Sequence, residues 1–141
     1  MIQLTRIEQV AKVLMGQSPS SNTCFEDGPG IPFIQGNAEF QIRHPLPKLK
    51  CSAPTRIAEK GDFLLSVRAP VGEINQADRK LVIGRGLSAL RFQAADQSFA
   101  WHSLKSAAHK LDKVAQGSTF VAVNRNDVES LEIPWFSKES Y

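Results

Sequence analysis

The segment 43–60 constrains the fold of this chain more than any other, because it carries three prolines in a short stretch. Proline fixes φ and removes a backbone N–H donor, so the segment is predicted to form neither a regular helix nor a central strand. It also holds five Lys or Arg residues and one acid, Glu59, which indicates a basic excursion on the surface. With eight Pro and nine Gly in 141 residues, the chain is too interrupted for a simple helical bundle.

The remaining composition is that of one globular domain. Hydrophobic residues make up 42% and charged residues 22%, so the chain can bury a core, and its net charge of +3 permits a nucleic-acid partner without demanding one.

No apolar run approaches the ~18 residues of a membrane span. Charges at Arg6, Glu8 and Lys12 interrupt any signal-peptide core, so we expect a cytoplasmic protein with no membrane association. In such a reducing compartment, Cys24 and Cys51 are expected to be free thiols.

Short strands and turns are predicted for the first third of the chain. Thr5 and Glu8 have the spacing of a capping box, which predicts a short helix at the start. Residues 10–14 and 31–35 are predicted strands, and 15–22 has the Gly, Pro and Ser content of a turn.

The region after the proline-rich segment is the most sheet-like. Its β-branched, leucine and aromatic runs are separated by short turns, which is typical of an antiparallel meander. The four predicted strands are residues 62–68, 71–74, 81–83 and 87–92.

One long helix is predicted at about 97–115, where apolar residues recur at helical spacing. Asp96 or Ser98 can cap its start, and Gly117 stands where a helix-ending glycine belongs. A strand at 118–123 and a helical turn at 127–131 are expected to follow. Together with the meander, these elements predict an α+β domain.

Motifs for catalysis are absent from the sequence. It contains no phosphate-binding GxxxxGK[ST] loop, no GxSxG elbow, no HExxH and no E-x-K nuclease signature. Gly84-Arg85-Gly86 begins a dinucleotide-binding pattern, but its continuation is missing, so a turn is the better interpretation. His102 and His109 share a helix face with no third ligand at metal-binding spacing. We therefore expect a binding module with no metal or cofactor rather than an enzyme.

Positive charge is concentrated in 43–60 and in 79–91, where there is no acid. If both stretches lie on one face, they would form a strip suited to phosphates, although scattered surface charge explains them equally well. The candidate phosphate contacts are Arg43, Lys48, Lys50, Arg68, Arg85 and Lys113.

Three predicted loops share a Gln beside a Gly. Gln and Asn bind adenine through two hydrogen bonds in the major groove, Ser and Thr are adaptable partners, and Gly permits close approach of the backbone. Each loop alone is more simply an ordinary turn, but their shared content favours binding. The candidate base contacts are Gln17, Ser18, Gln35, Asn37, Gln116, Ser118 and Thr119.

Several of these segments, in this order, carry a resemblance to a known family. They are TRIEQVAKVLMGQSPSS (5–21), IPFIQGNAEF (31–40), GDFLLSVRAPVGEINQADRKLVIGRGLSALR (61–91) and, after the predicted helix, QGST (116–119) with LEIP (131–134). The chain resembles one target recognition domain of the specificity subunit of type I restriction–modification enzymes, and the most specific match is GDxLL followed by IGRG.

The resemblance implies a fold and a function. The fold would be a twisted, mostly antiparallel sheet or partial barrel with a few helices. Residues 1–136 would form one recognition domain and 137–141 a tail where a spacer helix would begin. The domain would perform no catalysis but read one half of a bipartite sequence in double-stranded DNA. Its partners would be the DNA adenine methyltransferase (modification) subunit and the restriction subunit. A lone half-site gives few base contacts, and two linked domains gain affinity through effective concentration, so a homodimer is a further candidate partner.

Two other functions remain open from the sequence. The domain could act as a protein-interaction or regulatory module for the methyltransferase and restriction subunits without binding DNA tightly. A small nuclease is the weakest hypothesis, and it would depend on Asp62 or Asp78 as metal ligands.

Overall fold

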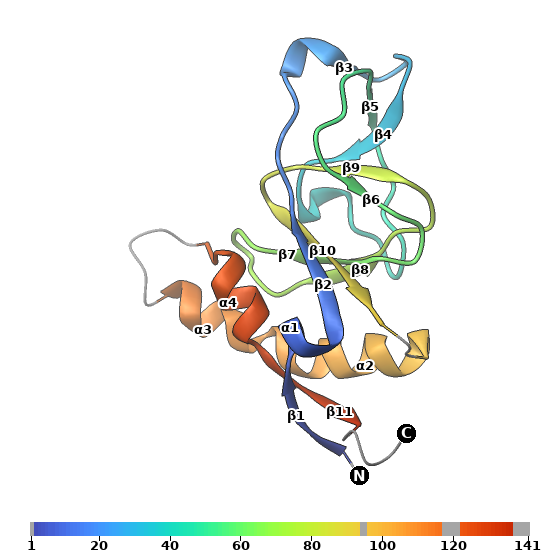
Figure 1. Ribbon diagram of the computed structural model, residues 1–141. Helices are drawn as coiled ribbons and strands as arrows, with labels where there is room; N and C mark the ends of the chain where they lie inside the picture. The colour runs from blue at the N-terminus through green and yellow to red at the C-terminus, as the bar shows by residue number, and fades with distance from the viewer. Residues whose placement is uncertain (1, 94–95, 117–121, 137–141) are drawn as a thin grey trace.

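All four residues of the strand β7 (Phe63–Ser66) are buried, and the apolar run that begins it marks the centre of the molecule. In the computed structural model, which describes residues 2–93, 96–116 and 122–136, β7 lies in a four-stranded antiparallel sheet (Figure 1). Its strand order is β2–β10–β7–β8, with β2 at Ala11–Met15, β10 at Leu87–Phe92 and β8 at Ile74–Gln76. A strand covered on both faces carries mostly apolar residues, which explains the run of Phe63, Leu64 and Leu65.

The two faces of this central sheet contribute to two separate apolar clusters. Phe63 and Leu65 point to one face, where they join Trp101 and Leu104 of the helix α2 (Gln97–Ala108). Leu64 points to the other face and joins a smaller cluster with side chains of the second sheet. The period-2 alternation of a strand therefore links the helical layer to the second sheet through a single element.

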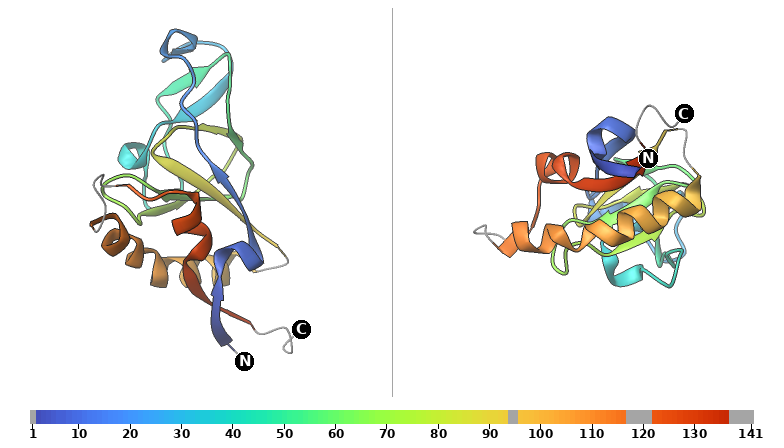
Figure 2. Two further views of the ribbon diagram at one scale, coloured as in Figure 1. Left: turned by 60° about the vertical axis from the view of Figure 1, so that its left-hand side comes forward. Right: turned by 90° about the horizontal axis from the view of Figure 1, so that it is seen from below.

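The second sheet has five short strands in the order β3–β5–β4–β9–β6, and it extends away from the chain ends (Figures 1 and 2). Their bounds are β3 Cys24–Phe25, β5 Leu49–Cys51, β4 Ile31–Ile34, β9 Leu81–Ile83 and β6 Ile57–Ala58. The pair β4–β9 is parallel, whereas the other pairs are antiparallel.

Two sequence predictions are corrected by this sheet. The simple meander is wrong, because β9 leaves the central sheet and pairs with β4 and β6, while β10 pairs with β7 and β2. The exclusion of a central strand from 43–60 is also wrong, because β5 lies between β3 and β4. The prolines Pro47 and Pro54 flank β5 and do not enter it, so its backbone donors remain available.

The prediction of free thiols is wrong as well. Cys24 and Cys51 are directly opposite each other in the antiparallel pair β3–β5, their Cα atoms are 4.2 Å apart, and they form a disulfide. The pairing follows from strand register between residues separated by 27 positions, which neither composition nor spacing reveals.

The chain ends meet at the opposite end of the molecule in a two-stranded antiparallel ribbon. Its strands are β1 (Ile2–Arg6) and β11 (Glu132–Phe136). Trp135 stacks on Phe92 with ring centroids 5.0 Å apart and lies 5.3 Å from Phe99, which ties the ribbon to the central sheet and to α2 (Figures 1 and 2).

The helical predictions are mostly confirmed. α2 begins after Asp96, whose carboxylate accepts the Phe99 N–H, and the expected long helix bends at His109 before continuing as α3 (Lys110–Gln116). Gly117 and most of the strand expected at 118–123 lie outside the described residues.

Two short helices complete the helical part. The predicted turn near 127–131 is α4 (Arg125–Ser130), which Asn124 caps. The first helix, α1, is shorter than expected (Ile7–Val10), and Thr5 lies in β1 rather than at the cap, where Arg6 stands instead.

The α+β class with mostly antiparallel sheets is confirmed, and the sheets do not close into a barrel within the part of the chain described. No helix in those ranges is long and apolar enough to cross a membrane.

The disulfide generates a stability prediction. Closing a loop of this length restricts the unfolded chain, so reduction of Cys24–Cys51 should lower the free energy of unfolding by about 2–4 kcal/mol. Urea unfolding with and without dithiothreitol measures the difference, and a variant with serine at both positions should show no response to the reductant. Titration of two free thiols in the unreduced, denatured protein would contradict the disulfide.

Candidate nucleic-acid interface

Three turns that are distant in sequence meet where the two sheets join. They are the turn after β2 (16–18), the turn after β4 (35–37) and the connection between β9 and β10 (84–86). Backbone hydrogen bonds hold them together: Gly16 N–H donates to Leu87 O at 2.9 Å, Gln17 N–H to Ile83 O at 3.0 Å, and Gly84 N–H to Ile34 O at 2.8 Å. We call this meeting point the glycine junction.

Glycine is required at the junction because the backbones nearly touch. A Cβ added at Gly16 would lie 1.9 Å from the carbonyl oxygen of Gly84. A Cβ at Gly84 would lie 2.7 Å from Oε1 of Gln35, and one at Gly86 would lie 3.0 Å from the Gln35 carbonyl oxygen. The IGRG run of the sequence therefore has a physical role, which is to let β10 turn away from β9 directly against Gln35.

Polar side chains project beside the junction. The backbone N–H of Arg85 donates to Ser18 Oγ at 3.2 Å, and the Ser18 hydroxyl donates to Gln35 Oε1 at 3.0 Å. These residues line an open groove of about 510 Å³ along the second sheet. The lining residues are Ser18, Pro19, Ser21, Cys24, Phe33, Gln35, Leu49 and Arg85.

Two other candidate base contacts lie near the junction. The side chain of Gln17 is exposed, and its carbonyl oxygen accepts the Thr55 hydroxyl. Asn37 donates from Nδ2 to Glu73 Oε2 at 2.9 Å, so part of its hydrogen-bonding capacity is used within the domain.

The third predicted loop cannot be placed. Gln116 ends α3 and its side chain is not described, whereas Ser118 and Thr119 lie outside the described residues.

The predicted phosphate contacts are spread over several elements. Arg85 lines the groove, and exposed Lys48 and Lys50 lie in or beside β5 of the same sheet. Arg68 is exposed and bridges to Ala122, while Lys113 is exposed on α3.

Arg43 belongs to the helical side of the molecule. Its guanidinium lies over the Trp101 ring, 4.0 Å from the centroid, and its Nε donates to Gln76 at 3.0 Å. These contacts favour a structural role for Arg43, because a guanidinium over an indole face is held by cation–π attraction.

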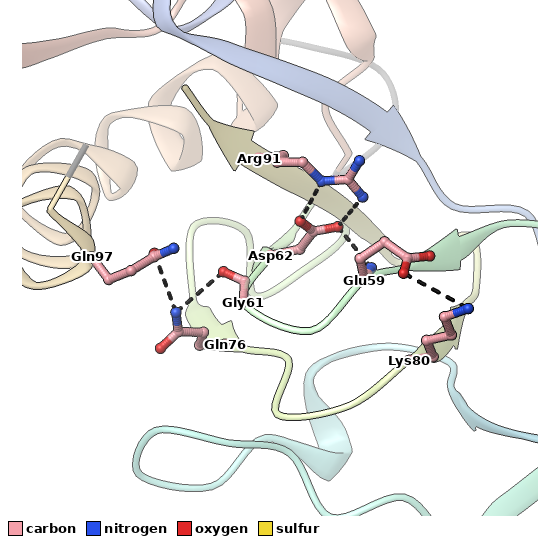
Figure 3. A network of polar contacts seen from close by, with 7 residues as sticks. All are labelled: Glu59, Gly61, Asp62, Gln76, Lys80, Arg91 and Gln97. Atoms are coloured by element: carbon pink, nitrogen blue, oxygen red, sulfur yellow. Dashed lines mark hydrogen bonds and ion pairs between the residues drawn. The ribbon is translucent and has the colours of Figure 1, made fainter. Parts of the chain in front are cut away.

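A polar network that the sequence analysis missed surrounds Asp62 (Figure 3). Asp62 is only 4% exposed and accepts two hydrogen bonds from Arg91, from Nε at 2.8 Å and from the terminal nitrogen at 3.0 Å. It also accepts the backbone N–H of Glu59 at 2.9 Å. The hydrogen bond that Arg91 donates to Asp62 raises the pKa of the Arg91 guanidinium above its usual value. No signal in the sequence could have paired residues 29 positions apart.

These contacts weaken the nuclease hypothesis. Asp62 is held by Arg91, and Asp78 is held by the neighbouring Arg79 at 3.1 Å, which also lowers the pKa of the Asp78 carboxyl. Guanidinium groups therefore occupy both carboxylates proposed as metal ligands. The described residues contain no cluster of His, Cys, Asp or Glu that could hold a metal ion.

Comparisons with known proteins place this geometry in a family. The fold matches the crystal structure of the HsdS subunit from Thermoanaerobacter tengcongensis, with a TM-score of 0.84 and 38% identity over 99% of this chain and 34% of that one. A chain from a study of complex assembly and conformational transition in the type I R-M system matches equally well, with 35% of that chain covered. The S subunit from M. genitalium shares the fold at a TM-score of 0.75 and 18% identity, covering 99% of this chain and 36% of that one.

The class of fold is thus that of type I specificity subunits. The chain belongs to the family described as the type I restriction modification DNA specificity domain, whose sequence model matches residues 2–137. It is also 40% identical, over 129 residues, to a protein of Methanocaldococcus jannaschii assigned as the type I restriction enzyme MjaX specificity subunit. The match covers 90% of this chain but 30% of that relative, so the chain spans about a third of the length of the proteins it resembles.

The glycine junction generates the second prediction. Gly16→Ala should destabilise the domain by about 1–3 kcal/mol, because the added methyl group would overlap the Gly84 carbonyl and force the turns apart. Gly36→Ala is the matched control, since an added Cβ there meets nothing within 4 Å. Thermal and urea unfolding measure both variants, and equal stability of the two would show that the junction is not closely packed.

The Asp62 network generates the third prediction. Asp62→Ala should lower the free energy of unfolding by about 2–3 kcal/mol, because three hydrogen bonds to a buried carboxylate are lost. Asp78→Ala, which removes an exposed pair, should cost less than about 1 kcal/mol. Urea unfolding compares them, and a cost for Asp62→Ala no larger than that for Asp78→Ala would contradict this role.

Proposed function

We propose that this chain reads one half of a bipartite double-stranded DNA sequence as a recognition domain of a type I restriction–modification specificity subunit. The observation that carries the proposal is the groove beside the glycine junction, where side chains capable of hydrogen bonding to bases stand on rigid turns. Ser18 and Gln35 are fixed by hydrogen bonds at that groove, and the Arg85 side chain lines it. Membership of the DNA specificity domain family supports the same function.

The candidate contacts divide into two groups in this proposal. The proposed base contacts are Gln17, Ser18 and Gln35. The proposed contacts to phosphates or base edges are Lys48, Lys50 and Arg85, which lie on the same side of the molecule as the second sheet. Phosphate contacts position a protein on the duplex and base contacts specify the sequence, so both groups are needed.

The remaining candidates have weaker support as DNA contacts. Arg43 and Asn37 have partners within the domain, Lys113 lies on α3, and Arg68, which bridges to Ala122, does not line the groove. We propose that these four serve the fold or another surface.

The domain is proposed to contain no catalytic site and to need no cofactor. Residues 1–136 are proposed to act as one recognition unit, as in the resemblance drawn from the sequence. Methylation of adenine and cleavage of DNA then fall to the modification and restriction subunits, which are the proposed protein partners in the cytoplasm. A homodimer would supply a second half-site through effective concentration.

Selection from a randomised duplex pool at two salt concentrations tests the proposal. We expect one short sequence to be enriched, with an affinity that falls steeply as salt rises. The double variant Lys48→Ala with Lys50→Ala should weaken binding about equally for all sequences. It should also reduce the slope of log affinity against log salt concentration by the amount expected for about two phosphate contacts. Lys110→Ala with Lys113→Ala on α3 removes the same charge from another surface and should leave both quantities unchanged.

Failure to enrich any sequence, even at low salt, would overturn the proposal. Retention of the methyltransferase and restriction subunits in a pull-down with no DNA affinity would instead favour the interaction module.

A further inference from the structure

The side-chain amide of Gln35 is held in one orientation by its neighbours. Ser18 Oγ accepts the Arg85 backbone N–H at 3.2 Å, and the Ser18 hydroxyl donates to Gln35 Oε1 at 3.0 Å. This chain of two hydrogen bonds places the amide oxygen of Gln35 on the side of the protein. A glutamine fixed in this way presents its hydrogen-bonding groups without a further loss of side-chain entropy on binding.

Packing at the glycine junction shields the same oxygen. An ideal Cβ on Gly84 would lie 2.7 Å from Gln35 Oε1, so the oxygen sits closely against the backbone of that residue. The amide nitrogen, by contrast, has no hydrogen-bond partner in residues 2–93, 96–116 and 122–136, and the Gln35 side chain is exposed. Gln35 therefore offers N–H donors to the groove while its acceptor faces inward.

Arg85 adds further donors to the same groove. Its side chain is exposed, lines the groove beside Gln35, and has no partner among the residues that the structure describes. A guanidinium has five N–H donors and no acceptor. The groove edge formed by Gln35 and Arg85 is consequently an array of donors.

We propose that Gln35 and Arg85 read guanine in the half-site. Guanine presents two adjacent acceptors, O6 and N7, in the major groove, whereas adenine and cytosine each present an amino donor that needs an acceptor, and thymine has one acceptor beside a methyl group. This choice differs from the adenine pairing expected for a freely rotating glutamine. The inference rests on the proposed function, and it names the base chemistry read by that site.

Base selection with an isosteric variant tests the inference. In Gln35→Glu, one carboxylate oxygen can keep the Ser18 bond while the other replaces the NH₂ group, so a donor becomes an acceptor at the same place. We expect the preference for guanine at one position of the selected site to fall at least about tenfold, with cytosine or adenine rising there. Gln3→Glu, on β1 at the opposite end of the domain, makes the same charge change and should leave the base preference unchanged.

A second measurement needs no protein variant. The wild-type protein is tested against the selected duplex with 7-deazaguanine replacing each guanine in turn. Loss of the N7 acceptor should weaken binding at least about fivefold at one position.

A further variant, Ser18→Ala, releases the Gln35 oxygen and should reduce the ratio of the affinities for guanine and adenine at that position.

The possible outcomes distinguish failure of the guanine-reading inference from failure of the proposed function. If no sequence is enriched, the proposed function itself fails. If a sequence is enriched but contains no guanine, or if Gln35→Glu and 7-deazaguanine leave the preference and affinity unchanged, the donor array is not the reader of guanine and the proposed function stands. Circular dichroism and urea unfolding of each variant confirm that a changed preference comes from a folded domain.

Discussion

The close approach of backbones at the glycine junction is the constraint on which the rest of the structure depends. Strands β9 and β10 follow each other in the chain but belong to different sheets, and the connection between them turns within residues 84–86. The carbonyl of Gly84 lies where a Cβ on Gly16 would stand, so the turn after β2 can lie this close to the β9–β10 connection only while residue 16 lacks a Cβ. The same contact places Gln35 at the groove. The contacts that pack the turns at this point therefore also position the side chain proposed to read a base.

The two sheets have different roles, one in the buried core and one at the groove. The central sheet is covered on one face by α2 and on the other by the second sheet, and its side chains take part in both of these apolar clusters. The second sheet is built from strands of two to four residues joined by long turns, and it carries the groove and the exposed lysines of β5. Turns on a rigid scaffold tolerate changes in side chains better than core strands do, so surface contacts can vary here at little cost to the fold.

Local signals in the sequence predicted the elements well and their partners poorly. Strand composition located β2, β4, β7 and β10 to within a few residues, and Asp96 marked the start of α2 because capping acts within one turn. The transfer of β9 to the second sheet, the Cys24–Cys51 disulfide and the Asp62–Arg91 pair all depend on long-range register, which has no local signature. In the candidate site, glycine and glutamine content pointed to two of the turns that meet at the glycine junction, but the distribution of the basic residues over different elements could be known only from the fold.

The terminal ribbon has a mechanical consequence. Both ends of the described chain leave the same end of the domain, where Ile2 pairs with Phe136 and the register runs inward to Arg6 and Glu132 (Figure 1). A force that separates these ends loads the ladder one pair at a time, so it opens like a zipper before any strand of the larger sheets is sheared. The hydrogen bond from Ile7 N–H to Leu131 O, 2.9 Å long, is the point at which further opening begins to reach α1 and the core. The ribbon can thus yield under tension and close again while the groove at the far end keeps its shape.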